Sequence, residues 1–279
     1  MRTIEPTDIT LDYKSIAEAR DMPGLRLILG AYAVPGPWRE ACKGLFYVKG
    51  VPYTPVVTAS EPGGDLSMGM QDADRDLRDW TAQSSAPVAI WNDERPRSTW
   101  VDQINLAERI EPQPPLVPGD IDQRVDMFGA INEIAGEHGL GWSKRLMIID
   151  GGLKALEPGA EGRAFFEHLG AKYGYNDVEV AAAPAHMAGI IRSLDQRLAA
   201  QKARGSQFMI GDRLSALDIY WSTFLTLFEP MSQERCPMST AFLDFYCNPY
   251  VETQEAISDA LLAHRDFIYE NYLELPIVF

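Results

Sequence analysis

The chain has 279 residues, of which 46% are hydrophobic and 23% charged, enough to bury a sizeable core in one large domain or two modest ones. Its 40 acidic and 25 basic side chains give a net charge of −15, which disfavours nucleic acids and anionic membrane surfaces as partners. The cysteines, Cys42, Cys236 and Cys247, are far apart and lack metal-binding spacing, so we expect a reducing compartment, no disulfide framework and no zinc site.

Residues 1–23 are polar and mixed in character, and we expect them to form an arm before the first structural element. They lack the apolar core of a signal peptide. No apolar run in the chain is long enough to cross a bilayer. We therefore expect a cytoplasmic protein with no membrane partner.

Residues 24–111 predict an α/β domain in which strands and helices alternate. Strands are expected at 25–30, 53–57 and 87–91, and helices at 38–49, 76–83 and 99–109. Between them, residues 58–75 are rich in Gly, Ser, Asp and Met and predict a long loop. Four prolines within residues 112–118 then predict a linker.

Residues 119–279 predict an all-α domain. Helices are expected at 120–138, 142–149, 162–169, 176–204, 216–228 and 239–245. The helix after Ser215 has the clearest start signal, because Ser215 is a favourable N-cap and Asp218 can complete a capping box. Leu214 can staple onto Ile219, and the apolar spacing that follows predicts a central helix.

The segment from Ala86 to Thr99 predicts a binding site. A proline at the start of a strand is tolerated at a sheet edge or after a cis peptide bond. If the Ala86–Pro87 bond is cis, the backbone N–H and C=O of Ala86 face outward and can pair with an extended peptide. Ser98 and Thr99 then stand at a helix N-terminus, where free N–H groups attract a carboxylate. Because Thr99 and Asp102 also resemble a capping box, helix capping without a ligand is the alternative.

Three segments together resemble the glutathione S-transferase superfamily. Residues 86–88 resemble its cis-proline segment, residues 98–109 its Glu-Ser turn and following helix, and residues 211–218 its N-cap and staple signature. The resemblance implies a thioredoxin-like α/β N-terminal domain followed by an all-α C-terminal domain. It also implies a homodimer, with glutathione as co-substrate bound by Ala86, Pro87, Ser98 and Thr99.

Two positions depart from the family's pattern in ways that bear on activity. Ser98 stands where the family has the Glu that holds the γ-glutamyl amine, whereas Thr99 keeps the hydroxyl that holds the carboxylate. The loop 33–39 has no Ser or Cys where the family carries its thiolate-stabilising group. Tyr32 is the nearest replacement, since its O–H can donate to a thiolate. The structural alternative is a half-buried tyrosine that anchors the loop.

The resemblance implies an enzyme that transfers the glutathione thiol to a small apolar or aromatic electrophile, or uses glutathione to reduce or isomerise it. The predicted substrate pocket comprises Val34, Pro35, Trp38 and Trp142. For the two tryptophans the alternative is core packing, with a solvated basic flank at residues 144–145. For the whole chain the alternative is a non-catalytic binding or scaffold protein that has lost the thiol activator.

Three further side chains, those of Arg39, Cys42 and Cys236, are of types that can carry chemistry. Arg39 could pair with a substrate carboxylate, but an exposed surface arginine is the more common case. Cys42 lies inside a helix and favours core packing, whereas Cys236 falls in a loop where it could be accessible. The histidines show no metal-binding spacing, so no metal site is predicted.

Overall fold

The structure is a computed structural model that describes residues 11–29, 34–57, 72–160, 162–238, 246 and 248–278. The chain divides into two compact units. Unit 1 comprises Met1–Leu116, Pro230–Asp244 and Tyr269–Phe279, and unit 2 comprises Val117–Glu229 and Phe245–Ile268.

Unit 1 contains a thioredoxin-like sheet of three strands with the order β2-β1-β3. The strands are β1 (Leu25–Ile28), β2 (Tyr53–Val56) and β3 (Val88–Trp91). Strand β1 pairs with β2 in parallel and with β3 antiparallel. The helices of this unit are α1 (Ile16–Ala19), α2 (Pro37–Val48), α3 (Asp72–Thr81) and α4 (Trp100–Ile110).

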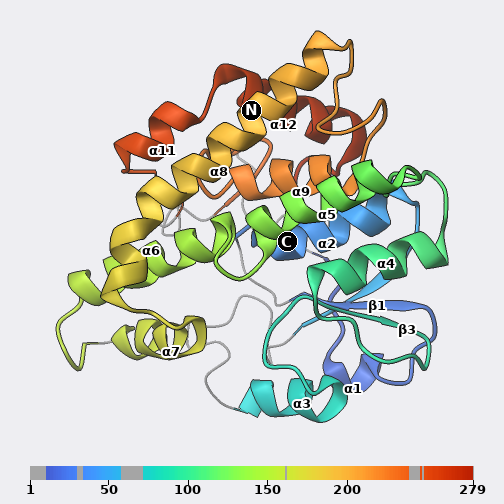
Figure 1. The fold of residues 1–279 in the computed structure, drawn as a ribbon. Coiled ribbons are helices and arrows are strands. Elements are labelled where there is room, and N and C mark those ends of the chain that lie inside the picture. The colour runs from blue at the N-terminus through green and yellow to red at the C-terminus, as the bar shows by residue number, and fades with distance from the viewer. Residues whose placement is uncertain are drawn as a thin grey trace. The chain divides into compact units, whose positions relative to one another are not determined.

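The helices of unit 1 lie on both faces of the sheet, with α1 and α3 on one face and α2 and α4 on the other (Figure 1). Alternate residues of the strands face α1 and α3, because successive side chains of a strand point to opposite faces. Ile28, Val88 and Ile90 form a buried cluster with Ile16 and Leu77 from these two helices. The sheet is therefore covered on both faces, in keeping with the full burial of β1.

Two expectations for unit 1 need correction. The described part of the predicted arm is integrated into the fold: Lys14 pairs with Val56 of β2, and Ile16 is buried. Helix α3 begins at Asp72, so residues 72–75, expected in the long loop, are helical. The remainder of that loop, residues 58–71, lies outside the described residues.

Unit 2 is helical throughout its described elements. They are α5 (Ile121–Ala135), α6 (Leu140–Ala155), α7 (Arg163–Tyr173), α8 (Asp177–Ala203), α9 (Ala216–Leu225), α11 (Val251–Ala256) and α12 (Asp259–Tyr272), whose residues from Tyr269 on belong to unit 1. The long helix α8 packs against α6 and α11, and α5 packs against α9 (Figure 1). No helix among the described residues is long and apolar enough to cross a membrane.

The predicted start of helix α9 is confirmed. The Asp218 carboxylate accepts hydrogen bonds from the backbone N–H of Ser215 at 2.9 Å and from its hydroxyl at 2.7 Å. All ten residues of the helix are buried, and so is Leu214, the predicted staple residue. The helix expected at 239–245 lies outside the described residues, and α11 and α12 were not predicted.

The division into units differs from the expected helical domain over 119–279 at two segments. Residues 230–238 and 269–278 belong to unit 1. There the backbone N–H of Ile277 donates to the C=O of Arg235 at 2.8 Å, and Lys43 of α2 donates to the C=O of Val278. These contacts join parts of the chain that are far apart in sequence, so no local pattern signals them.

Candidate functional site

The segment that opens β3 has the backbone conformation that the family resemblance implies. The Ala86–Pro87 peptide bond is cis. Pro87 is buried and Ala86 is half-buried. The backbone N–H and C=O of Ala86 have no hydrogen-bond partner among the residues that the structure describes. They are therefore available to an extended ligand.

The turn that carries Ser98 and Thr99 is tied to β3 through its backbone. Arg97 and Ala89 exchange two hydrogen bonds, with N···O distances of 2.8 and 2.9 Å, in an antiparallel bridge. Because the bridge is antiparallel, residues that follow Arg97 run beside residues that precede Ala89. The register therefore directs Ser98 and Thr99 toward Pro87.

Gln103 holds the two segments together, and sequence reasoning missed it. Its side chain is buried in the first half of α4. The amide Nε2 donates to the C=O of Pro87 at 3.1 Å and to the C=O of Arg97 at 3.3 Å. The sequence did offer a signal, because Gln103 lies on the helical face that also carries the apolar Ile104 and Ala107. A buried amide needs hydrogen-bond partners, so a glutamine at that position indicates that such partners exist.

Thr99 is the N-cap of α4, as the capping alternative expects. Its Oγ1 accepts a hydrogen bond from the backbone N–H of Asp102 at 3.1 Å. The hydroxyl hydrogen has no acceptor among the described residues. A hydroxyl can accept and donate together, so capping the helix leaves Thr99 able to donate to a ligand carboxylate.

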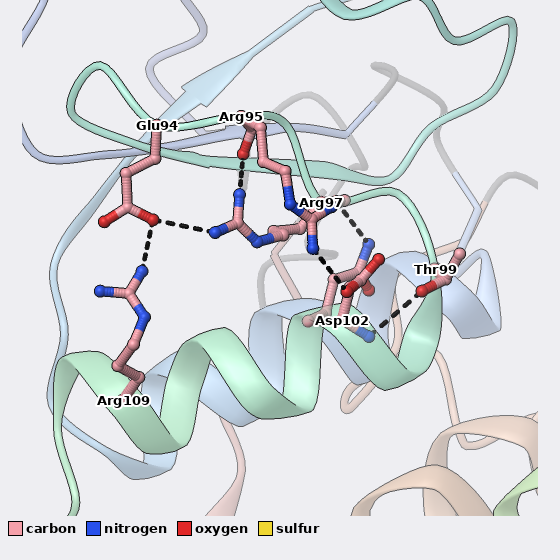
Figure 2. Close-up of polar contacts among 7 residues, drawn as sticks. Glu94, Arg95, Arg97, Thr99, Asp102 and Arg109 are labelled. Carbon is pink, nitrogen blue, oxygen red and sulfur yellow. Dashed lines mark hydrogen bonds and ion pairs between the residues drawn. The ribbon is translucent and has the colours of Figure 1, made fainter.

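Ion pairs surround this turn (Figure 2). The Glu94 carboxylate pairs with Arg97 at 2.9 Å and also with Arg109, and Arg95 pairs with Asp102 at 3.2 Å. Arg109 lies at the far end of α4 from Thr99, whereas Arg95 and Arg97 lie beside the turn and are each paired with a carboxylate (Figure 2). The N-terminus of α4 carries partial positive charge, which favours an anionic ligand at the turn.

The predicted pocket residues near α2 are partly buried. Pro35 is buried, and Val34 and Trp38 are half-buried. Arg39 is 4% exposed, donates to the C=O of Val34 and pairs with Glu40 at 3.0 Å. The expectation of an exposed surface arginine is therefore wrong, because the guanidinium is used inside the fold.

The predicted activator, Tyr32, lies outside the described residues, so its role stays a prediction. Trp142, the fourth predicted pocket residue, lies in α6 of unit 2, whereas Val34 and Trp38 lie in unit 1. A pocket shared by these residues also stays a prediction.

The surroundings of Trp142 differ from the solvated basic flank that the core-packing alternative expects at residues 144–145. Its ring meets Tyr173 edge-on, with centroids 4.8 Å apart. Lys144 is buried, and its Nζ lies 5.3 Å from the ring centroid of Phe228. Arg145 lies over Tyr173 at 5.6 Å. These cations contact aromatic faces, a favourable arrangement, and Lys144 is not a solvated side chain.

Neither described cysteine has the environment of a reactive thiol. Burial raises the pKa of Cys42 far above its usual range, and Cys42 packs in the core as expected. Cys236 is 2% exposed, and burial raises its pKa to about 12. The expectation of an accessible Cys236 is therefore wrong. No cluster of three or more potential metal ligands occurs in the described part of the chain.

Solved structures resemble this chain over most of its length. The β-etherase LigF from Sphingobium sp. strain SYK-6 is 18% identical, with 84% of this chain and 98% of that chain covered and a TM-score of 0.55. A glutathione S-transferase from Xanthobacter autotrophicus Py2 is 13% identical, with 90% and 96% covered and a TM-score of 0.53. The chain has the glutathione S-transferase fold.

Ure2p in complex with glutathione is a third neighbour, 12% identical, with 87% of this chain and 98% of that chain covered and a TM-score of 0.50. No protein-family model matches the sequence, and no curated protein is significantly similar to it. The fold that the resemblance implied, a thioredoxin-like domain followed by a helical one, is confirmed.

Proposed function

We propose that this protein is a glutathione-dependent transferase of the glutathione S-transferase superfamily. The observation that carries the proposal is the pair of open polar groups at the start of β3 and α4. The backbone of Ala86 lacks a partner among the described residues, and the hydroxyl hydrogen of Thr99 is free there as well. In the proposed complex the peptide backbone of glutathione lies along Ala86, and its γ-glutamyl carboxylate accepts from Thr99.

The surroundings of Ser98 support an anionic ligand. The N-terminus of α4 carries partial positive charge, and Arg95 and Arg97 lie beside the turn (Figure 2). The chain offers no acidic side chain at position 98 for the γ-glutamyl ammonium. Glutathione is therefore expected to bind more weakly than in a member with Glu at that position, by about tenfold to a hundredfold.

The proposed second substrate is a small apolar or aromatic electrophile held near Val34, Pro35, Trp38 and Trp142. Tyr32 is the proposed thiol activator, because the loop 33–37 offers no other hydroxyl or thiol. Donation from its O–H to the sulfur stabilises the thiolate over the thiol, and one pKa unit of such stabilisation corresponds to about 1.4 kcal/mol. A cytoplasmic homodimer completes the proposal.

A glutathione-binding protein without catalysis is the second candidate. Two features of the sequence favour it: Ser98 in place of an acidic residue, and the sequence Val34–Pro35–Gly36, which has no hydroxyl or thiol. The nearest described thiol, Cys42, cannot serve as a substitute because it is buried with a raised pKa.

Calorimetric titration with glutathione tests the binding site. Thr99→Ala removes the proposed donor and also an N-cap, which costs about 1 kcal/mol of stability. Asp120→Ala is the matched control, because the Asp120 side chain accepts from the backbone N–H of Gln123 at 2.9 Å and caps α5 in the same way. Thr99→Ala is expected to weaken glutathione binding and Thr99→Ser to preserve it, while Asp120→Ala leaves it unchanged. Equal affinities in all three variants would remove Thr99 from the site.

Two further variants separate the two candidate functions. Ser98→Glu is expected to tighten glutathione binding, since it adds the missing counter-charge. Tyr32→Phe is expected to reduce turnover and leave affinity unchanged, with chloro-dinitrobenzene and a β-ether in the substrate panel because the neighbour LigF is a β-etherase. Glutathione binding without turnover of any electrophile by the unaltered protein would support the binding protein instead.

A further inference from the structure

The first half of helix α2 buries three charged side chains, two cations that both pair with one carboxylate. Arg39, Glu40 and Lys43 are 4%, 7% and 5% exposed. The Glu40 carboxylate pairs with Arg39 at 3.0 Å through one oxygen and with Lys43 at 3.0 Å through the other. Buried charges are costly unless they are paired and hydrogen-bonded, so each of the three needs all of its contacts. We call them the α2 ion-pair chain.

One end of the α2 ion-pair chain holds the turn that precedes the helix. The Arg39 guanidinium donates to the C=O of Val34, and the same carbonyl accepts from the N–H of Gly36 at 3.0 Å. Gly36 is the N-cap of α2 and has no side chain that could fix the turn. Arg39 therefore holds residues 34–36, the Val34 turn, against α2.

The other end of the α2 ion-pair chain holds residues 274–278, which follow α12. The Lys43 ammonium donates to the C=O of Val278 and lies 4.0 Å from the Glu274 carboxylate. Burial raises the pKa of Glu274, and Lys43 opposes that shift. Ile277 is 2% exposed, and its backbone N–H donates to the C=O of Arg235. The 274–278 segment is thus docked on the rest of unit 1 by both its backbone and its side chains.

The two ends share one carboxylate. If the 274–278 segment leaves, Lys43 keeps Glu40 as its partner among the described residues, and Glu40 is drawn toward the lysine. The Glu40 carboxylate is then drawn away from Arg39, which donates to the Val34 turn. The contacts therefore form an unbroken path from residue 278 to residue 34.

We propose that the α2 ion-pair chain makes the position of the Val34 turn depend on docking of the 274–278 segment, with Lys43 and Arg39 as positioning residues. The proposal rests on the proposed function in one respect: the Val34 turn is taken as part of the site that receives the glutathione sulfur. Docking of the segment would then be required for full glutathione affinity.

Hydrogen exchange of the ligand-free protein, followed by mass spectrometry, tests the coupling without reference to glutathione. Lys43→Met removes the ammonium and keeps a side chain of similar length. Ile277→Ala loosens the 274–278 segment and leaves every residue of α2 in place. Lys49→Met is the matched control, because Lys49 is also buried at the end of α2 but binds the C=O groups of Glu111 and Pro114.

Lys43→Met and Ile277→Ala are both expected to increase exchange at residues 34–40 and at 274–278 several-fold. Lys49→Met is expected to increase it at residues 111–116 and to leave 34–40 unchanged. Lys43→Arg, which keeps the charge, is expected to restore the slow exchange. Unchanged exchange at 34–40 in Ile277→Ala would overturn the proposal, even if Lys43→Met does not fold.

Calorimetry with glutathione on the same variants then tests the link to the site. Ile277→Ala and Lys43→Met are expected to weaken binding several-fold, and Lys49→Met to leave it unchanged. Unaltered affinity in Ile277→Ala, with faster exchange at 34–40, would overturn the role in binding. If the unaltered protein does not bind glutathione, the proposed function fails, while the exchange data still decide whether the coupling exists.

Discussion

Helices α2 and α9 are both buried in their units, but they are stabilised in different ways. All ten residues of α9 are buried, and its largest are Tyr220, Trp221 and Phe224. The buried face of α2 includes Arg39, Glu40 and Lys43, whose partners come from the Val34 turn and the 274–278 segment. Helix α9 therefore depends on apolar burial and a local cap, whereas the buried charges of α2 depend on the turn before it and on a segment distant in sequence.

The largest effect is expected at Asp218, the one charged side chain in α9. It is fully buried, accepts from Ser215 twice and from the N–H of Met209 at 2.7 Å, and lies 3.1 Å from Nε2 of His264. Asp218→Ala leaves the donors of Ser215 and Met209 without this acceptor, and it is expected to lower the free energy of unfolding by about 3–5 kcal/mol. A lower urea midpoint with an unchanged slope is the expected observation.

Ser215→Ala is the control for that prediction. It removes the hydroxyl and leaves Asp218 bonded to Met209 and to the Ser215 backbone. The expected cost is about 1 kcal/mol, the usual value for an N-cap. If the two variants lose the same stability, Asp218 acts only as a cap, and α9 is less dependent on it than its burial indicates.

The second effect concerns the far end of α2. Lys49, the C-cap residue, donates to the C=O of Glu111 at 2.7 Å and of Pro114 at 2.9 Å, and pairs with Glu108 at 2.8 Å. Lys49→Met leaves two carbonyls unpaired but spares the partly exposed Glu108. We expect a loss of about 1–3 kcal/mol in urea denaturation. A neutral result would show that buried lysines in α2 do not require their distant partners.

The same contrast explains what the sequence could predict. The start of α9 was predicted correctly because its cap and staple lie within a few residues of one another. The cis Ala86–Pro87 bond was implied by the family resemblance, because the local rule for a strand-opening proline also allows a sheet edge. Docking of residues 274–278 was missed, because it depends on contacts across more than 200 residues of sequence, as between Lys43 and Val278. Burial of Arg39 was missed although Val34 and Glu40 are close in sequence, because a guanidinium that donates to a loop carbonyl leaves no pattern in the sequence.

The candidate site shows the same limit. The positions of Ala86 and Thr99 follow from local rules for proline and for helix caps. The role of Gln103 depends on two carbonyls, those of Pro87 and Arg97, that only the folded sheet brings to its amide. A polar residue on an apolar helix face indicates that a partner exists, but it does not identify that partner.

A smaller effect is expected inside α9 itself. The Thr223 hydroxyl bonds to the C=O of Ile219 at 2.9 Å and of Tyr220 at 3.1 Å, both in its own helix. Those carbonyls can keep their helical partners, so Thr223→Val is expected to cost about 0.5–1.5 kcal/mol. Thermal denaturation measures it. A much larger loss would show that α9 also depends on polar contacts beyond its own helix.

The smallest effect is expected where charges pair at the surface, between α5 and α8. Arg197 donates to both oxygens of Asp126, at 2.5 and 2.7 Å, and the Asp126 side chain is half exposed. Solvent screens such a pair, so Asp126→Asn is expected to cost only about 0.2–1 kcal/mol at neutral pH. This pair is the exposed counterpart of the ion pairs buried in α2.

The pH dependence of that loss identifies its cause. The hydrogen bonds from Arg197 hold the pKa of Asp126 below its ordinary value. A carboxylate with a lowered folded-state pKa contributes stability above its unfolded pKa of about 3.9 and loses it as pH falls through the folded value. Urea midpoints of the unaltered protein and Asp126→Asn should therefore differ at pH 7 and converge in acid. A difference that persists below both pKa values would mean that packing of the side chain, and not its charge, supports the contact between α5 and α8.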